Sequence, residues 1–235
     1  MKNCFYLCFF CLHLLFYSTL EAQNGEIRAI ALATTQIKQL KGGVLLIRLH
    51  SKKNLTDTLR KKGMPEQAEE IEKKQSYYNL EIIHAFRESF NFCPVYFFYS
   101  EYSEAVKKKQ FDKVIFLNEK LRQDTSIKFN AQQFFCAEFG TISNDTSRSS
   151  VTHYETDSGK QPEAHTKQYE GADGPTTGIT GIIIESDQFI QLRKPFPFYK
   201  RTYTSVFGKR IIKNAVAGMN ENLLAFYNYA TGHKK

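Results

Sequence analysis

The sequence predicts a single α/β domain, in which a mixed β-sheet with a parallel βαβαβ core flanked by helices precedes antiparallel C-terminal strands and a C-terminal helix. Short apolar runs bounded by turn residues indicate buried strands. Stretches with apolar residues every three or four positions separate the first of these runs, as crossover helices do. The later runs follow one another without such a helix, which favours antiparallel pairing.

The first half of the chain alternates between the two patterns. Residues 26–40 have helical spacing, and the apolar run Val44–Leu49 is typical of a buried strand. Residues 54–90 predict two helices, because Gly63-Met64-Pro65 interrupts their periodicity. The second of these helices carries an apolar stripe opposite a charged face, so we expect it to pack on the sheet.

Two further strands are predicted before residue 120. Pro94–Tyr99 is a nearly continuous aromatic and β-branched run, which indicates a strand covered on both faces. Glu101–Lys109 reads as a short helix or turn, and Val114–Leu117 as a third strand. Strand, helix, strand, helix, strand is the order of a parallel sheet.

The second half differs in pattern. Residues 132–142 and 179–185 predict strands, and residues 189–192 a hairpin partner for the latter. A last amphipathic helix is expected over residues 209–230. The polar segment 143–177 has almost no aliphatic residues, and its composition favours disorder.

Residues 1–22 have the pattern of a secretory signal. Lys2 precedes an apolar stretch from Cys4 to Leu20, and Ala22 supplies a small residue before Gln23. An uncleaved anchor is the alternative, but 17 residues are at the short limit for spanning a bilayer. We therefore expect an exported protein, periplasmic or secreted, whose mature domain is residues 23–235 and has no transmembrane segment.

Two cysteines, Cys93 and Cys136, belong to the expected mature domain. In an oxidising compartment they could form one disulfide, or they could be buried thiols. The sequence has neither a C-x-x-C pair nor a Cys/His cluster at metal-ligand spacing. Thiol redox catalysis and a metal site are therefore disfavoured, and no cofactor is predicted.

The formal net charge of +8 favours acidic partners, such as nucleic acid, anionic lipid head groups or an anionic glycan. An envelope protein or an acidic ligand is a possible partner. The alternative is a soluble protein with a slightly basic surface. The lysines and arginines are spread along the chain and mixed with carboxylates, so there is no strong nucleic-acid signal.

Several segments resemble an uncharacterised family of exported proteins from Bacteroidota. They are Phe92–Ser100, Val114–Leu121, Ala137–Thr141 and Gln188–Tyr203, together with a leader that ends at Ala22-Gln23. The resemblance implies a compartment and a lineage. It implies no activity, because none is known for the family.

One segment, residues 193–203, alternates aromatic and basic side chains around two prolines. Aromatic rings beside cations can stack on sugars or bases and neutralise anions, so the segment is a candidate binding surface. The alternative is a rigid connection whose aromatics cover the core while its cations stay in water. The candidate residues are Arg193, Lys194, Phe196, Phe198, Tyr199, Lys200, Arg201 and Tyr203.

Polar residues follow each of the first three predicted strands. His50 follows the first, Ser100 and Glu101 the second, and Glu119 lies just after the third. Parallel strands end at one edge of a sheet, where α/β folds place their sites, so these groups could perform acid–base catalysis. Polar residues also end strands simply because strands reach the surface there. Glu138 inside a predicted strand could be a buried carboxylate that marks a site, although such residues more often face solvent or pair with arginine.

No nucleophile elbow, dinucleotide loop or NTP-binding loop is present in the sequence. The absence of these motifs favours a non-enzymatic binding module. A hydrolase with its site at the strand ends near His50, Ser100 and Glu119 is the alternative, and charge-driven binding of an anionic glycan or nucleic acid is the third.

Overall fold

The structure is a computed structural model, and it describes residues 25–127, 129, 131–143, 149–155, 163–169, 176–202 and 208–232. Its strands are β1 (Val44–Leu49), β2 (Val95–Tyr99), β3 (Phe116–Leu117), β4 (Phe134–Ser143), β5 (Ser149–Glu155), β6 (Glu163–Tyr169), β7 (Thr176–Glu185) and β8 (Tyr199–Arg201). Its helices are residues 25–42, α2 (Lys53–Lys61), α3 (Pro65–Ser89), α4 (Ser103–Lys107) and α5 (Gly208–Thr231), with short 3₁₀ turns at Ser100–Tyr102 and Phe111–Lys113.

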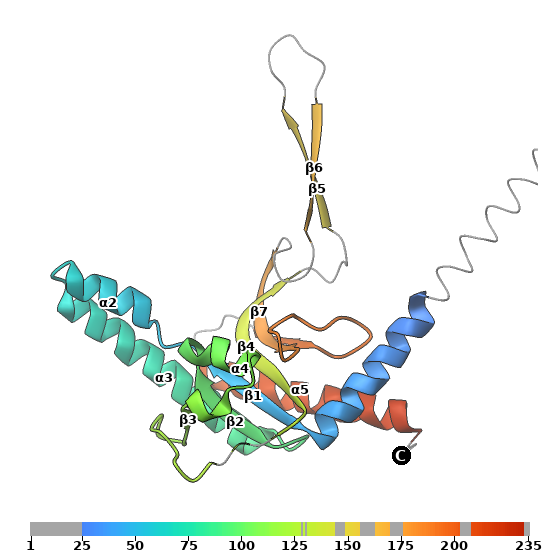
Figure 1. Cartoon of the computed structure of the whole chain (residues 1–235), viewed down its shortest axis with the longest axis horizontal. Coiled ribbons are helices and arrows are strands. Elements are labelled where there is room, and N and C mark those ends of the chain that lie inside the picture. The colour runs from blue at the N-terminus through green and yellow to red at the C-terminus, as the bar shows by residue number, and fades with distance from the viewer. Residues whose placement is uncertain are drawn as a thin grey trace, which may run out of the picture.

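The fold is mixed α/β, as the sequence predicts (Figure 1). Six strands form one sheet in the order β3-β2-β1-β4-β7-β8. Strands β2, β1 and β4 are parallel to one another, whereas β3, β7 and β8 each pair antiparallel with their neighbours. The three early apolar runs are therefore neighbouring strands of one sheet.

The two faces of the sheet are covered differently. Alternate residues of β1 enter two separate cores, with Leu45, Ile47 and Leu49 in the larger one and Leu46 in the smaller one. The helix over residues 25–42, α3 and α5 all contribute to the larger core, while α4 contributes Val106 to the smaller one. The expectation that helices flank both faces is thus met on one face by three long helices and on the other by a single short one.

The third parallel strand is β4, and the prediction of a parallel third strand at residues 114–117 is wrong. Strand β3 is only two residues long and pairs antiparallel with β2. Helix α4, between them, has five residues. The connection between β2 and β3, residues 100–115, contains this helix and two 3₁₀ turns, and it reverses the chain direction instead of returning it for a parallel pairing.

The segment 143–177, for which composition predicts disorder, contains two strands that the structure describes. Strands β5 and β6 pair antiparallel with each other from Ser149↔Tyr169 to Glu155↔Glu163 and form a separate two-stranded sheet that projects from the domain in Figure 1. Its backbone groups pair with each other rather than with the central sheet. This is how a polar segment can adopt strands without contributing to the core.

The predicted hairpin partner at residues 189–192 makes only an isolated bridge, Glu185↔Gln191. The strand that pairs with β7 is instead β8, which begins two residues after Pro197 and forms the edge of the sheet. A proline is tolerated just before an edge strand, because the amide hydrogen that it lacks is not needed inside the ladder.

Cys93 and Cys136 are both free thiols and buried, so the disulfide considered from the sequence is not formed. Cys93 belongs to the larger core and Cys136 to the smaller one, so the two side chains lie on opposite faces of the sheet. Burial raises the pKa of Cys93 to about 12 and the pKa of Cys136 well above its ordinary value, which keeps both as inert thiols.

The predicted leader, residues 1–22, lies outside the described residues. Within the part of the chain that the structure does describe, none of the helices combines the length and apolar character needed to cross a membrane.

Candidate functional site

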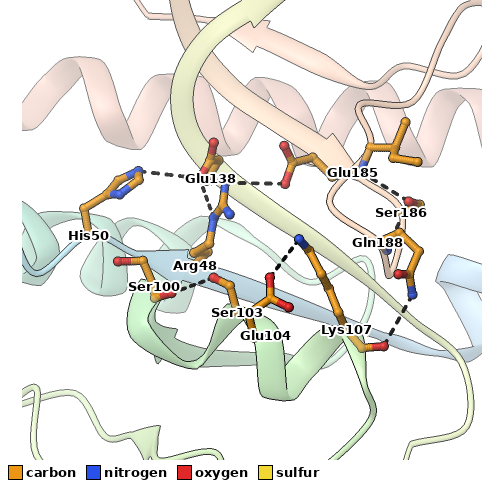
Figure 2. A network of polar contacts seen from close by, with 11 residues as sticks. Arg48, His50, Ser100, Ser103, Glu104, Lys107, Glu138, Glu185, Ser186 and Gln188 are labelled. Carbon is orange, nitrogen blue, oxygen red and sulfur yellow. Dashed lines mark hydrogen bonds and ion pairs between the residues drawn. The ribbon is translucent and has the colours of Figure 1, made fainter. Parts of the chain in front are cut away.

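Four charged or titratable side chains lie together on the face of the sheet that carries the smaller core (Figure 2). Arg48 follows Leu46 by two residues on β1, and His50 follows Arg48 by two residues just after the strand ends, so both lie on the same face as Leu46. Ile47 pairs with Ala137 and Cys136 pairs with Glu185, which places Glu138 beside Arg48 and Glu185 on the same face. Strand alternation and register alone therefore bring the four together.

The position of this cluster follows from the topology. The connection that leaves β1 contains α3 and covers the larger core, whereas the connection from β2 to β4 contains α4 and covers the smaller core. Strands β1 and β4 are neighbours whose connections lie on opposite faces of the sheet. Ligands of open α/β sheets bind at such a switch point, outside the carboxyl ends of the strands.

Glu138 is held by three nitrogens on a single oxygen. Arg48 Nε lies 2.6 Å and Arg48 Nη2 2.5 Å from Glu138 Oε2, and His50 Nε2 lies 3.5 Å from the same atom. Desolvation raises the pKa of the Glu138 carboxyl, but the His50 hydrogen bond and the Arg48 charge outweigh it, so the net pKa is lowered. Glu138 is therefore an ionised carboxylate that can orient His50.

A missing side chain at Gly140 makes room for this carboxylate. A Cβ atom at this position would lie 3.1 Å from Glu138 Oε1, which is shorter than most Cβ contacts in proteins. Glycine at this position leaves the second carboxylate oxygen in place while Arg48 and His50 contact the first. Gly140, two residues after Glu138 on β4, is thus part of the geometry of the cluster.

The pKa of Glu185 is shifted in the opposite direction to that of Glu138. Its Oε2 atom is buried and has no hydrogen-bond partner among the residues that the structure describes, and the nearest cation is Arg48 Nη2 at 4.0 Å. Desolvation and the charge of Glu138 raise the pKa of Glu185 to about 7, against smaller opposing effects of Arg48 and Lys107. Two carboxyls near one guanidinium thus have pKa values shifted in opposite directions, a pattern that separates acid from base in catalytic pairs.

Phe189 covers the cluster from the loop after β7. The guanidinium carbon of Arg48 lies 4.6 Å from the centre of its ring, and Lys107 Nζ of α4 lies 5.6 Å from it. The Arg48 side chain is 20% exposed and that of Glu185 9%, whereas that of His50 is 41% exposed. Among these groups, the cluster is most open to solvent at His50.

A pocket of about 300 Å³ lies beside His50. Its lining consists of His50, Ser100, Glu101 and residues 51–55, which lead into the first turn of α2. Buried Asn79 of α3 holds the backbone of His50 in place, because its amide donates a hydrogen bond of 2.8 Å to the carbonyl oxygen of His50. Three of the four residues predicted at the strand ends, His50, Ser100 and Glu101, are thus brought together.

The fourth predicted residue, Glu119, does not belong to the site. Its carboxylate pairs with Arg87 of α3 at 3.4 Å and is 63% exposed. Because β3 runs antiparallel to β2, the carboxyl end of β3 lies beside the amino end of β2, whereas Ser100 follows the carboxyl end of β2. The prediction for Glu119 is wrong for the same reason as the predicted direction of the third strand.

The aromatic and basic segment does not form the surface that was considered from the sequence. Phe196 and Phe198 are each 1% exposed and belong to the larger core, and Tyr199 packs against that core. The stem of Lys200 lies against Gly218 of α5. Arg193, Lys194 and Arg201 are exposed, and Tyr203 lies outside the described residues. Burial of aromatic area stabilises the fold, so the rings cover the core while these three cations lie at the surface.

Sequence reasoning considered Glu138 but missed Arg48 and Glu185. Both interrupt or end an apolar strand run, at VLLIRL and ITGIIIE. A charged residue inside a run that is otherwise buried needs a partner, and this was the available signal. The partners of Arg48 and Glu185 could not be identified from the sequence, because neither apolar run indicates which strands lie next to it in the sheet.

In the described part of the chain, no group of three or more histidine, cysteine, aspartate or glutamate side chains could hold a metal ion. The positive charge that balances Glu138 is supplied by Arg48 instead.

No protein-family model matches the sequence, and no curated protein and no solved structure matches the chain.

Proposed function

We propose that the protein is a hydrolase in which His50 acts as the general base. The observation that carries this proposal is the chain Arg48–Glu138–His50, which ends at a pocket also lined by Ser100. A histidine oriented by a carboxylate, with a hydroxyl nearby, is the arrangement that activates a nucleophile in many unrelated hydrolases. Arg48 and Glu138 act as positioning residues, because they hold the imidazole rather than contact the substrate.

The pocket favours a small substrate with an anionic group. Lys52 and Lys53 line it together with one carboxylate, Glu101. Lys53 also pairs with Asp57, at 2.7 Å. The positive charges of Lys52 and Lys53 and the N-terminal end of α2 together favour a negatively charged group in the pocket. In this proposal, His50 takes the proton of the Ser100 hydroxyl or of a water molecule, and the resulting oxygen attacks the ester carbonyl or phosphorus. The bond to the leaving alcohol breaks, and the alcohol takes the proton from His50. Where Ser100 is the nucleophile, a water molecule that gives its proton to His50 then hydrolyses the ester on Ser100, and the serine oxygen recovers the proton.

The experiment is a hydrolysis assay on the purified protein with 4-nitrophenyl acetate, 4-nitrophenyl butyrate and 4-nitrophenyl phosphate. We expect turnover of at least one ester, and His50→Ala should lower kcat/KM by about 10²- to 10⁴-fold. Glu138→Gln should lower kcat and alter the pH–rate profile, because it removes the charge that orients His50. Ser100→Ala separates a serine nucleophile from an activated water, since only the former is abolished.

Glu119→Gln is the matched control, because it changes a glutamate that was predicted at the site but pairs with Arg87 elsewhere. It should leave turnover unchanged. A wild-type protein without turnover above buffer, or a His50→Ala variant as active as the wild type, would overturn the proposal. Circular dichroism of each variant checks that loss of activity is not loss of the fold.

We further propose that this chemistry takes place outside the cytoplasm. The support is the pattern of residues 1–22, which has the charge, apolar stretch and small residue of a cleaved secretory signal.

A further inference from the structure

A second concave surface lies away from the pocket beside His50 and shares none of its lining residues. It is a groove of about 650 Å³ between the helix over residues 25–42 and the loop at residues 186–194 that follows β7. The helix contributes Ala29, Leu32, Ala33 and Gln36. These positions are three, four and seven residues apart, so one face of the helix forms one wall.

The groove has an apolar floor and exposed apolar edges. Ala33 and Leu192 are buried beneath it, while Leu32 is 60% exposed and Ile190 is 50% exposed. The first turns of the same helix expose Ile27 as well, at 64%. Large apolar side chains concentrated around one concavity mark an interaction surface rather than the scattered exposure that is normal for a protein.

The charged residues that line the groove indicate the charge of the occupant that it can bind. Arg193 and Lys194 line the end of the loop wall, and among the described residues that form the lining none is acidic. An occupant therefore needs apolar side chains for the middle of the groove and carboxylates for its cationic end. A groove wall built from one helix face is the kind of surface that receives an amphipathic segment.

We propose that this groove binds an acidic amphipathic segment of a partner protein. Apolar side chains of the partner lie between Leu32 and Ile190, and carboxylates of the partner face Arg193 and Lys194. The binding surface expected from the sequence is thereby moved from the rings of Phe196 and Phe198, which are buried, to the groove that begins beside them.

The test uses a defined probe, a fluorescein-labelled 14-residue amphipathic peptide made of leucine and glutamate, with a second peptide in which lysine replaces every glutamate. Fluorescence anisotropy with the purified protein should show saturable binding of the acidic peptide and at least tenfold weaker binding of the basic one. Leu32→Asp and Ile190→Asp should each weaken the acidic peptide at least tenfold. The double variant Arg193→Glu/Lys194→Glu should weaken it by roughly tenfold and remove its salt dependence.

Met64→Asp is the control, because it places the same charge on another exposed apolar residue, 44% exposed, at the start of α3. It should bind the acidic peptide like the wild type. The proposal is overturned if no acidic peptide binds, or if Leu32→Asp binds it as tightly as Met64→Asp does. It is also overturned if sedimentation velocity shows a dimer that Leu32→Asp dissociates, or if anionic vesicles of phosphatidylglycerol and phosphatidylcholine bind through Leu32 while the peptide does not.

Discussion

Replacing Glu185 by glutamine should make the protein more stable at neutral and alkaline pH. Glu185 is buried, its Oε2 atom has no hydrogen-bond partner among the described residues, and its pKa is raised to about 7 by burial and by the neighbouring charge of Glu138. The folded state therefore binds this proton more tightly than the unfolded chain does. Glutamine has nearly the same shape and carries no proton to lose.

The magnitude follows from the two pKa values. The ordinary pKa is 4.5 and the folded one is about 7, so between these pH values the native state holds more protons than the unfolded state. The stability that Glu185 contributes is fully present below pH 4.5 and is lost as the pH rises to about 7. At about 1.4 kcal/mol per pKa unit, the loss is about 3 kcal/mol, and it stays constant above pH 7.

The assay is urea unfolding followed by circular dichroism between pH 4.5 and 8, with the wild type and Glu185→Gln side by side. The difference in the free energy of unfolding between the variant and the wild type should grow by about 3 kcal/mol in favour of the variant across this range. Glu119→Gln, at a mostly exposed carboxylate, should show no such growth. Parallel curves for Glu185→Gln and the wild type would refute the reasoning, because they would mean that Glu185 titrates alike in both states.

Two other predictions concern the segments that the sequence singled out. Phe196→Ala should lower the free energy of unfolding by about 3–5 kcal/mol, because this ring is 1% exposed in the larger core. Ile190→Ala, at a half-exposed side chain, should change the free energy of unfolding by less than about 1 kcal/mol. Equal effects of the two substitutions in urea unfolding would contradict the placement of Phe196 in the core. Intact-mass analysis of the protein from the periplasm or the medium of its host should find Gln23 at the N-terminus, and a chain that keeps Met1 in the cytoplasm would refute export.

The elements of the fold were predictable where local patterns decide them. The run Val44–Leu49 is β1 without an error at either end, and the helix predicted over residues 209–230 is α5 within one residue at each end. Strand direction was harder, because a short apolar run looks the same in sequence whether it pairs parallel or antiparallel. The prediction for residues 114–117 failed on this point, since β3 pairs antiparallel with β2.

The site was predictable in part, for a similar reason. His50, Ser100 and Glu101 could be placed together because they follow two parallel strands directly. Arg48 and Glu185 required the knowledge that β4 lies between β1 and β7, which no local pattern contains. The rings of residues 193–203 were ambiguous, because an aromatic side chain next to a lysine looks the same in sequence whether it is buried or exposed.

Strand β1 has a consequence for how the chain assembles. It lies in the middle of the sheet, and its two neighbours are β2, about 50 residues later, and β4, about 90 residues later. Until the second neighbour has been synthesised and docked, β1 offers unpaired backbone groups to any other extended chain. Such distant pairing also slows folding. Arg48 and Glu138 meet only when β4 docks on β1, so the proposed site cannot form before that step, and a truncation before residue 134 leaves one edge of β1 unpaired.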